Sequence, residues 1–97
     1  MVKVLSEKER ILKQFQKLPS IGKAGSQDLW EIGIRNINEL KNQNPSDLYN
    51  KLNLITGLKH DICMLYTFRC IVYYVTEEKH DNNKLNWWYW KDKTYLE

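Results

Sequence analysis

The segment LPSIGKAGSQDLWEIGI, residues 18–34, contains the residue types from which a chain builds an anion-binding turn. A proline and two glycines lie between two stretches with apolar residues at helical spacing, and Lys23 lies within the turn. When a helix begins directly after a tight turn, its unpaired backbone N–H groups and its dipole attract an anion. A lysine adds a charge-assisted hydrogen bond to a phosphate oxygen.

The candidate binding residues are those of the turn together with the last lysine of the preceding helix. Glycine suits this chemistry because a Cβ atom would keep a phosphate away from the backbone. Such contacts reach the backbone of a nucleic-acid strand and carry no sequence information. The predicted phosphate site consists of Ser20, Ile21, Gly22, Lys23, Gly25 and Lys17. A turn that only connects two helices is the alternative interpretation.

Positive charge is concentrated around this turn. The 97 residues have a formal net charge of +3. Residues 1–24 contain six basic and two acidic side chains, residues 25–76 are balanced, and residues 77–97 carry four lysines against five acids. We therefore expect an anionic partner to bind the N-terminal quarter. A lysine-rich helix face that is merely solvated is the alternative.

The sequence WWYW, residues 87–90, offers a second kind of nucleic-acid contact. Unpaired bases stack on aromatic rings, so Trp88 and Tyr89 are candidate base-stacking residues. Core packing competes with this role, because a short domain needs the buried area of its large aromatic side chains. We expect Trp87 and Trp90 to point inward and core packing to dominate.

Metal binding and catalysis find little support. His60, Cys63 and Cys70 are ligand types, but Cys70 lies two helical turns from Cys63, and a metal site needs three or four converging ligands. A Cys63 nucleophile with His60 as its base lacks an oxyanion donor and an orienting acid. We expect no metal, no cofactor and no enzymatic activity.

The N-terminal charges and the cysteines limit the class of protein. The N-terminal residues are charged throughout, so we expect neither a secretory signal nor a membrane span. If Cys63 and Cys70 share a helix, about 10 Å of axial rise separates them, which is too far for a disulfide. Free thiols are typical of a reducing compartment, and we expect a cytoplasmic protein. The final Leu96-Glu97 is typical of residues that a cloning vector adds before a tag.

Start and stop signals predict five helices. A capping box of Ser6 and Glu9 begins the first helix, and Pro19 ends it because proline disfavours a helical residue before it. Asn44 followed by Pro45 is an N-cap before a proline at the first helical position. The predicted helices span residues 7–17, 25–32, 37–40, 45–54 and 59–77.

The last of these helices should form the centre of the fold. Residues 62–75 are apolar except for Thr67 and Arg69, which favours a buried helix over a membrane span. Residues 71–75 also have strand propensity, but no other segment is suited to pair with them. Arg69 must find an acidic partner or a helix C-terminus, since an unpaired buried charge is costly.

These elements predict an all-α fold. We expect residues 1–97 to form one compact five-helix domain, with the Trp-rich tail, residues 84–95, packed on its core.

Residues 11–34 resemble a helix-hairpin-helix motif, whose usual form is a proline, a glycine-hydrophobe-glycine hairpin and a second helix that ends before Gly-Ile. The match includes Pro19, Ile21, Gly22, Leu29, Gly33 and Ile34. Ser20 stands where the first hairpin glycine is usual.

A closer resemblance covers residues 12–92. The segments DLWEIGIRNINELKNQNPSDLYNKL, HDICMLYTFRCIVYY and KLNWWYWKD are similar to those of the small bacterial pathogenicity-locus family of helix-hairpin-helix proteins. The order of Asp61-x-Cys63, Tyr66-x-x-Arg69-Cys70 and the tryptophan cluster carries this likeness. The resemblance implies a helical domain with a DNA-binding hairpin and no established enzyme activity or cofactor.

Two functions are consistent with these observations. The first is non-enzymatic, sequence-independent binding to duplex DNA, weak for a single hairpin and strengthened by a partner protein or by a homodimer. The second is a protein-interaction or scaffold module in which the hairpin is only structural. Ser20 and the acids Asp28 and Glu31 favour the second.

Overall fold

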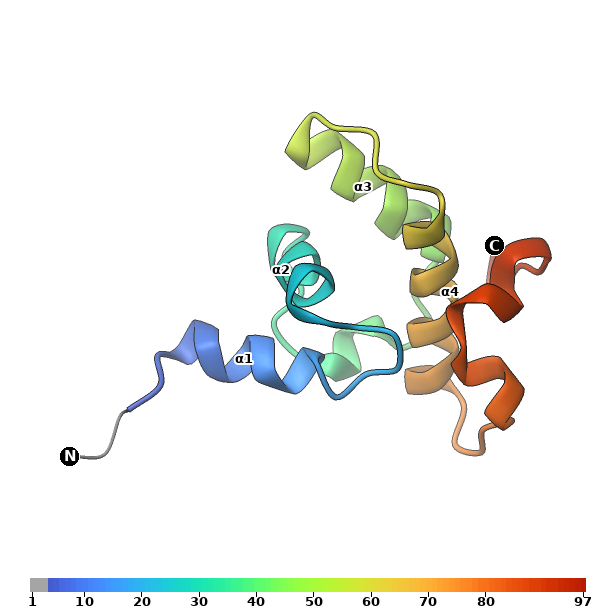
Figure 1. The fold of residues 1–97 in the computed structure, drawn as a ribbon, viewed down its shortest axis with the longest axis horizontal. Coiled ribbons are helices and arrows are strands. Elements are labelled where there is room, and N and C mark those ends of the chain that lie inside the picture. Colours follow the sequence, from blue (N-terminus) through green and yellow to red (C-terminus); the bar gives the residue numbers. More distant parts are fainter. Residues whose placement is uncertain (1–3) are drawn as a thin grey trace.

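Helices account for most of the fold. The computed structural model describes residues 4–97, and no strand occurs within that range. The α-helices are α1 (Glu7–Phe15), α2 (Lys23–Glu31), α3 (Pro45–Thr56) and α4 (Cys63–Thr76). Three short 3-10 helices are η1 (Ile37–Leu40), η2 (Asn82–Leu85) and η3 (Trp87–Asp92) (Figure 1). The all-α prediction is confirmed, with the five predicted helices in the expected order and the third of them a 3-10 helix.

The capping signals act as predicted. The Ser6 hydroxyl accepts a hydrogen bond from the N–H of Glu9, and the Glu9 carboxylate accepts one from the N–H of Ser6. The Asn44 side chain caps α3 ahead of Pro45, and Gly57 ends that helix in the left-handed conformation at φ 69°. Asn36 caps η1 through the N–H of Asn38.

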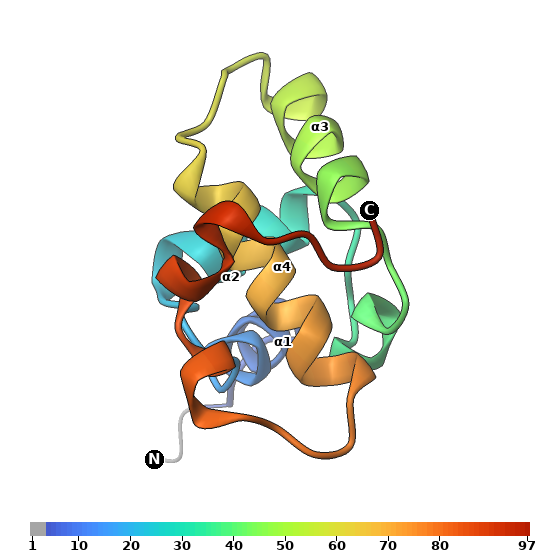
Figure 2. The same ribbon diagram turned by 90° about the vertical axis from the view of Figure 1, so that its right-hand side faces the viewer.

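Helix α4 lies at the centre, as the sequence predicts. It packs against α3 and η1 on one side and against η2 and η3 on the other. Figure 1 shows α4 between the N-terminal helices and the C-terminal segment, and Figure 2 shows the C-terminal segment crossing over it. Residues 63–76 form one α-helix, so the strand alternative for residues 71–75 is wrong, and residues 67–73 are all buried. No helix within residues 4–97 is long and apolar enough to cross a membrane.

Two hydrophobic clusters share α4. The larger joins its inner face to the N-terminal helices through side chains with almost no exposure: Phe15, Leu29, Ile32, Leu40, Leu52, Phe68, Ile71 and Val72. The smaller is made by Cys70, Tyr73 and Trp90 and attaches the tail. Trp90 donates its indole N–H to the carbonyl of Lys84 at 2.9 Å. These contacts hold the aromatic tail on the core, as the sequence predicts.

Helix boundaries differ from the prediction by one to four residues: α2 spans residues 23–31 and not 25–32, and α3 continues to Thr56 and not residue 54. α1 ends at Phe15 and not at residue 17, and α4 begins at Cys63 and not at residue 59. Residues 57–61 instead wrap around the end of α3. The N–H of His60 donates to the Asn53 side chain at 2.8 Å, and the Tyr49 hydroxyl donates to the carbonyl of His60. These contacts to α3 hold the chain out of a helix.

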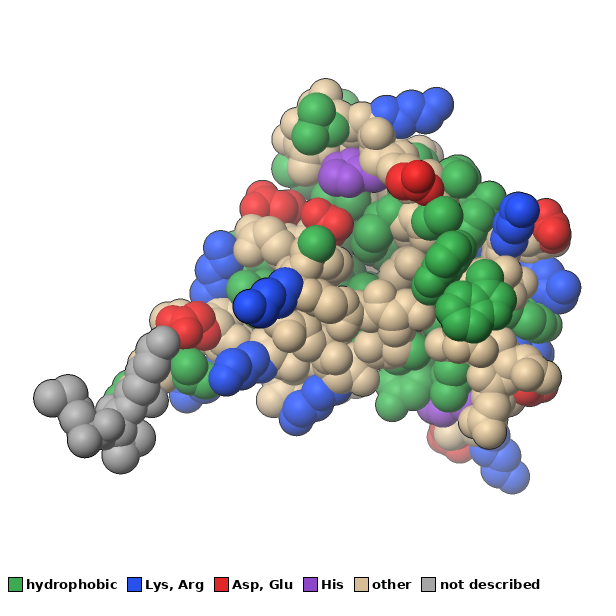
Figure 3. All heavy atoms as spheres, in the orientation of Figure 1, with side chains coloured by type: hydrophobic (Ala, Val, Ile, Leu, Met, Phe, Trp, Pro, Cys, Tyr) green, Lys and Arg blue, Asp and Glu red, His purple; other side chains and the backbone are tan. Residues whose placement is uncertain are grey.

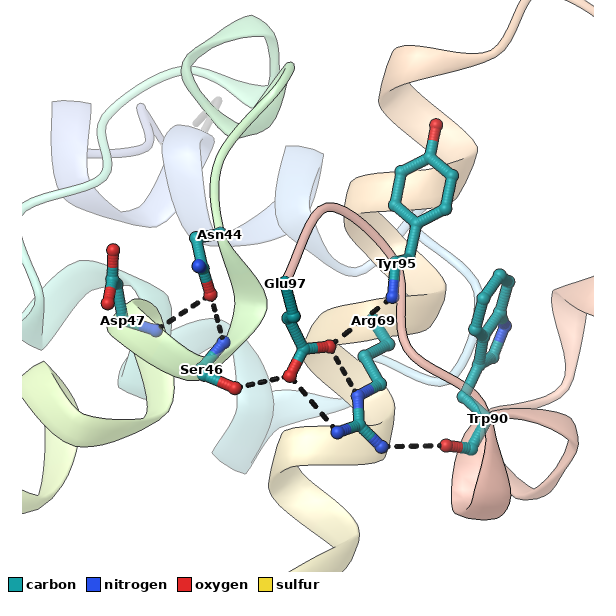
Figure 4. A network of polar contacts seen from close by, with 7 residues as sticks. All are labelled: Asn44, Ser46, Asp47, Arg69, Trp90, Tyr95 and Glu97. Atoms are coloured by element: carbon teal, nitrogen blue, oxygen red, sulfur yellow. Dashed lines mark hydrogen bonds and ion pairs between the residues drawn. The ribbon is translucent and has the colours of Figure 1, made fainter.

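Arg69 has the acidic partner that its burial requires (Figure 4). Its guanidinium contacts the carboxylate of Glu97 through Nε at 2.5 Å and Nη2 at 3.0 Å, and its Nη1 donates to the carbonyl of Trp90 at 3.0 Å. Ser46 at the start of α3 donates its hydroxyl to the same carboxylate. The network therefore joins α3, α4 and the C-terminal segment.

Candidate nucleic-acid interface

A tight turn at residues 16–22, termed here the α1–α2 turn, connects the first two helices. The N–H of Ile21 donates to the carbonyl of Leu18 at 3.3 Å, and Pro19 and Ser20 lie between them. Ser20 has a φ of 66°. Proline at the second position and a positive φ at the third match a type II turn, in which glycine or asparagine usually takes the third position. Ser20 thus occupies a backbone conformation that favours glycine.

The Ser20 side chain connects this turn to α4. Burial raises the pKa of the Cys70 thiol to about 11, and a hydrogen bond from the Ser20 hydroxyl acts in the opposite direction. The Cys70 sulfur also lies 3.6 Å from the carbonyl of Lys84. Ser20 therefore lies close to the buried thiol of Cys70 on α4.

Helix α2 begins without a side-chain cap. Gly22 is its N-cap residue, at φ −103°, and provides no side chain to accept from the first turn. The earliest hydrogen bond of the helix runs from the N–H of Ser26 to the carbonyl of Gly22, at 2.9 Å. The backbone N–H groups of residues 22–25 make no hydrogen bond within the part of the chain that the structure describes. These donors, at the positive end of a nine-residue helix, suit an anion.

Two predicted phosphate-binding residues have other roles. The side chain of Ile21 is buried and its N–H is used within the turn, so it has no free donor. Gly25 lies inside α2 and not in the turn. A Cβ atom at Gly25 would come within 3.2 Å of Ile21 Cδ1, so the glycine lets Ile21 pack against the first turn of α2. Ile21 therefore supports the turn without offering a donor, whereas Gly25 still offers its backbone N–H from the first turn of α2.

Lysine side chains surround the start of α2. Lys17 and Lys23 are exposed, as the predicted role requires. Lys13 and Lys23 line a shallow depression between α1 and α2, together with the amides of Gln16 and Gln27 and the carboxylate of Glu9. Figure 3 shows lysine and arginine side chains gathered over α1 and α2. The sequence prediction did not include Lys13, which lies in the last turn of α1.

The small side chain of Ser26 lets the two helices approach. Ser26 is buried and donates its hydroxyl to the carbonyl of Lys23 at 2.7 Å. Gln16, at the end of α1, lies 3.4 Å from that hydroxyl through Nε2. The lysines and the free N–H groups are thus held on one rigid pair of helices.

The aromatic tail divides between packing and exposure. Trp90 is buried, and Trp87 is half-buried with its ring edge-to-face against Trp88 at 5.8 Å. Trp88 is 60% exposed. Tyr89 is half-buried, packs edge-to-face on Trp90, and has the Lys93 ammonium 4.8 Å from its ring centre. Of the two candidate stacking residues, Trp88 has the more accessible ring.

The remaining candidates serve structural roles. The His60 ring lies 3.0 Å from the Thr56 hydroxyl, and the Asp61 carboxylate accepts from the N–H of Cys63 at 2.8 Å. Cys63 and Cys70 are both free thiols. Within residues 4–97, no three His, Cys, Asp or Glu side chains gather as metal ligands would.

Comparison with models of known protein families identifies the family of this chain. The family model described as Cdd1, pathogenicity locus, matches residues 8–95. The chain belongs to this pathogenicity-locus family. The matched range covers α1, the α1–α2 turn and the aromatic tail, while Glu97, the partner of Arg69, lies beyond it. No curated protein and no solved structure is similar enough to the chain to count as a match.

Proposed function

We propose that the protein is a non-enzymatic DNA-binding module of the helix-hairpin-helix type, which binds the phosphate backbone of duplex DNA without reading sequence. The observation that carries this proposal is the coincidence of free N–H groups and lysines at one helix start. Residues 22–25 leave four backbone donors unpaired, Lys23 begins the same helix and is exposed, and Lys17 is exposed in the turn that precedes it. A phosphate at this position would accept from the backbone and be neutralised by lysine.

Binding through one such turn should be weak. A single helix start contacts few phosphates, and non-specific DNA binding has dissociation constants of about 10⁻⁴ to 10⁻⁶ M at physiological salt. Trp88 offers a separate stacking position for an unpaired base, because its ring is exposed. A cytoplasmic location accords with two free cysteines.

An amide NMR titration of the labelled protein tests the proposal. A short duplex at low salt should shift the resonances of Ile21 to Gly25 and of the nearby lysines, and added salt should reverse the shifts. The double variant Lys17→Glu, Lys23→Glu should lose these shifts, because it replaces two cations by anions beside the phosphate.

A matched variant controls for net charge. Lys41 and Lys79 are exposed and do not line the depression between α1 and α2. Lys41→Glu, Lys79→Glu changes the total charge equally and should retain most of the binding. Equal loss in both double variants, or unchanged affinity in the first, would refute a site at the turn. Indole shifts with a single strand alone would move the site to Trp88.

A protein-interaction or scaffold module is the second candidate function. The contact between Ser20 and Cys70 favours it, because the turn then has a structural reason for its shape. In that case a defined protein partner should co-purify with the chain and remain bound after nuclease treatment, whereas the Lys17→Glu, Lys23→Glu variant should retain that partner.

A further inference from the structure

The end of α3 and the chain after it expose a group of aliphatic side chains. Leu54, Ile55, Leu58 and Ile62 are 84%, 48%, 66% and 48% exposed. We refer to these four as the α3–α4 tip. Seven large hydrophobic side chains are exposed in the described residues, and four of them fall in these nine positions. Scattered exposed apolar residues are ordinary, but a contiguous group marks an interaction surface.

The tip projects from the body of the protein. Figures 1 and 2 show the far end of α3 and the following loop standing away from α1 and from the C-terminal segment. The opposite face of α3 buries Leu48, Tyr49 and Leu52 in the core, as its helical spacing predicts. The exposed leucines and isoleucines therefore have no packing role within the described fold.

Hydrogen bonds hold this exposed segment in place. The Thr56 hydroxyl donates to the carbonyl of Leu52 at 2.8 Å, and the N–H of Gly57 donates to the carbonyl of Asn53 at 3.0 Å. The Asn53 side chain in turn binds the N–H of His60 at 2.8 Å. A surface that is already ordered loses less conformational entropy when it binds.

The charges at the edge of the tip complement one another. Residues 53–58 carry no charge, and Lys59 and Asp61 follow as exposed groups of opposite sign. Neither forms an ion pair within residues 4–97. Further charged groups of both signs lie near the tip: Asp28 is close to His60, Lys91 is close to Cys63, and Lys51 has its ammonium near Gly33. In a two-fold contact, Lys59 of one copy can face Asp61 of the other, whereas a partner of one sign would leave one group unmatched.

We propose that the α3–α4 tip is a symmetric interface through which two copies of this chain pair. The exposed fractions of these four residues add up to about two and a half fully exposed residues. This area is small, so the contact belongs among small interfaces. The dimer should therefore be weak and dependent on concentration. The tip contains no residue of the α1–α2 turn, so each copy keeps that turn free, and the inference does not depend on DNA binding.

Analytical ultracentrifugation without DNA tests the pairing. The wild-type chain should change from monomer to dimer between about 1 µM and 1 mM. Leu54→Glu and Leu54→Lys each place like charges on two tips that face one another, and each should raise the dissociation constant at least about tenfold. Leu54 is 84% exposed, so neither substitution disturbs the core. Mixing the two variants in equal amounts should restore the dimer, because the tips then carry opposite charges.

A control variant separates the tip from general changes in charge. Val4 is also 84% exposed but lies before α1, so Val4→Glu should dimerise as the wild type does. A wild-type chain that stays monomeric at the highest concentration would overturn the proposal. Leu54 variants that dimerise normally, or a mixture of the two that stays monomeric, would also overturn it.

Discussion

Replacing Lys17 and Lys23 by glutamine should flatten the salt dependence of DNA binding. Three exposed lysines, residues 13, 17 and 23, surround the free N–H groups at the start of α2. The logarithm of the binding constant falls with the logarithm of salt by about 0.9 for each phosphate that a cation neutralises. Three lysines give a slope of about −2.7, so a fourfold rise in salt should weaken binding about 40-fold.

The double variant leaves Lys13 as the one cation in that group. Its slope should be about −0.9, and the same rise in salt should weaken binding only about 3.5-fold. Fluorescence anisotropy with a labelled duplex of about 20 base pairs, between about 50 and 200 mM salt, measures both slopes. Lys41→Gln, Lys79→Gln is the matched control and should keep the wild-type slope. Equal slopes in the wild type and in the Lys17, Lys23 variant would refute the assignment of phosphate contacts to these lysines.

Two further substitutions test single parts of the structure. Gly22→Ser should raise the free energy of unfolding by about 0.3 kcal/mol, because the new serine hydroxyl caps α2. The same hydroxyl should weaken duplex binding, because it occupies N–H groups that would otherwise bind a phosphate. Thermal unfolding and anisotropy measure the two effects, and a stabilised variant with unchanged affinity would contradict the phosphate site. Partial burial alone would raise the pKa of Glu97, but its hydrogen bonds with Arg69, Ser46 and Tyr95 hold that pKa below 4.5. The stability it contributes is present above pH 4.5 and lost as pH falls through the lower folded-state pKa, so the wild type should lose more thermal stability in acid than Glu97→Gln. If the melting temperatures of the wild type and of Glu97→Gln change with pH in the same way, the pair with Arg69 contributes nothing to stability.

Local signals in the sequence were sufficient for most of the fold. The capping box at Ser6, the Asn44-Pro45 pair and Gly57 act within a few residues, so pattern alone locates the helices that they bound. The apolar run of residues 62–75 is long enough to identify a buried helix, and Arg69 within it has the partner that burial demands.

Contacts between distant residues decide what the pattern missed. α4 begins four residues later than predicted because His60 is bound by Tyr49 and Asn53, which lie on α3. Helix α2 begins at Lys23, two residues before the predicted start, and the closeness of the Ile21 side chain to Gly25 is a contact that no spacing rule reveals. The exposure of Leu54 likewise depends on how far α3 extends past the core. For the candidate site, the residue types and the lysines were predictable, but the use of the Ile21 N–H within the turn was not.

The burial of Cys70 beside the α1–α2 turn has a consequence for oxidation chemistry. Thiols react as thiolates, and a thiol with a pKa of about 11 is almost entirely protonated at neutral pH. Cys70 is also fully buried, so there is almost no thiolate to attack a peroxide or a glutathione disulfide, and neither oxidant has a path to the sulfur. The support behind the α1–α2 turn should keep its shape under oxidative stress, when exposed thiols elsewhere in a cell are being modified.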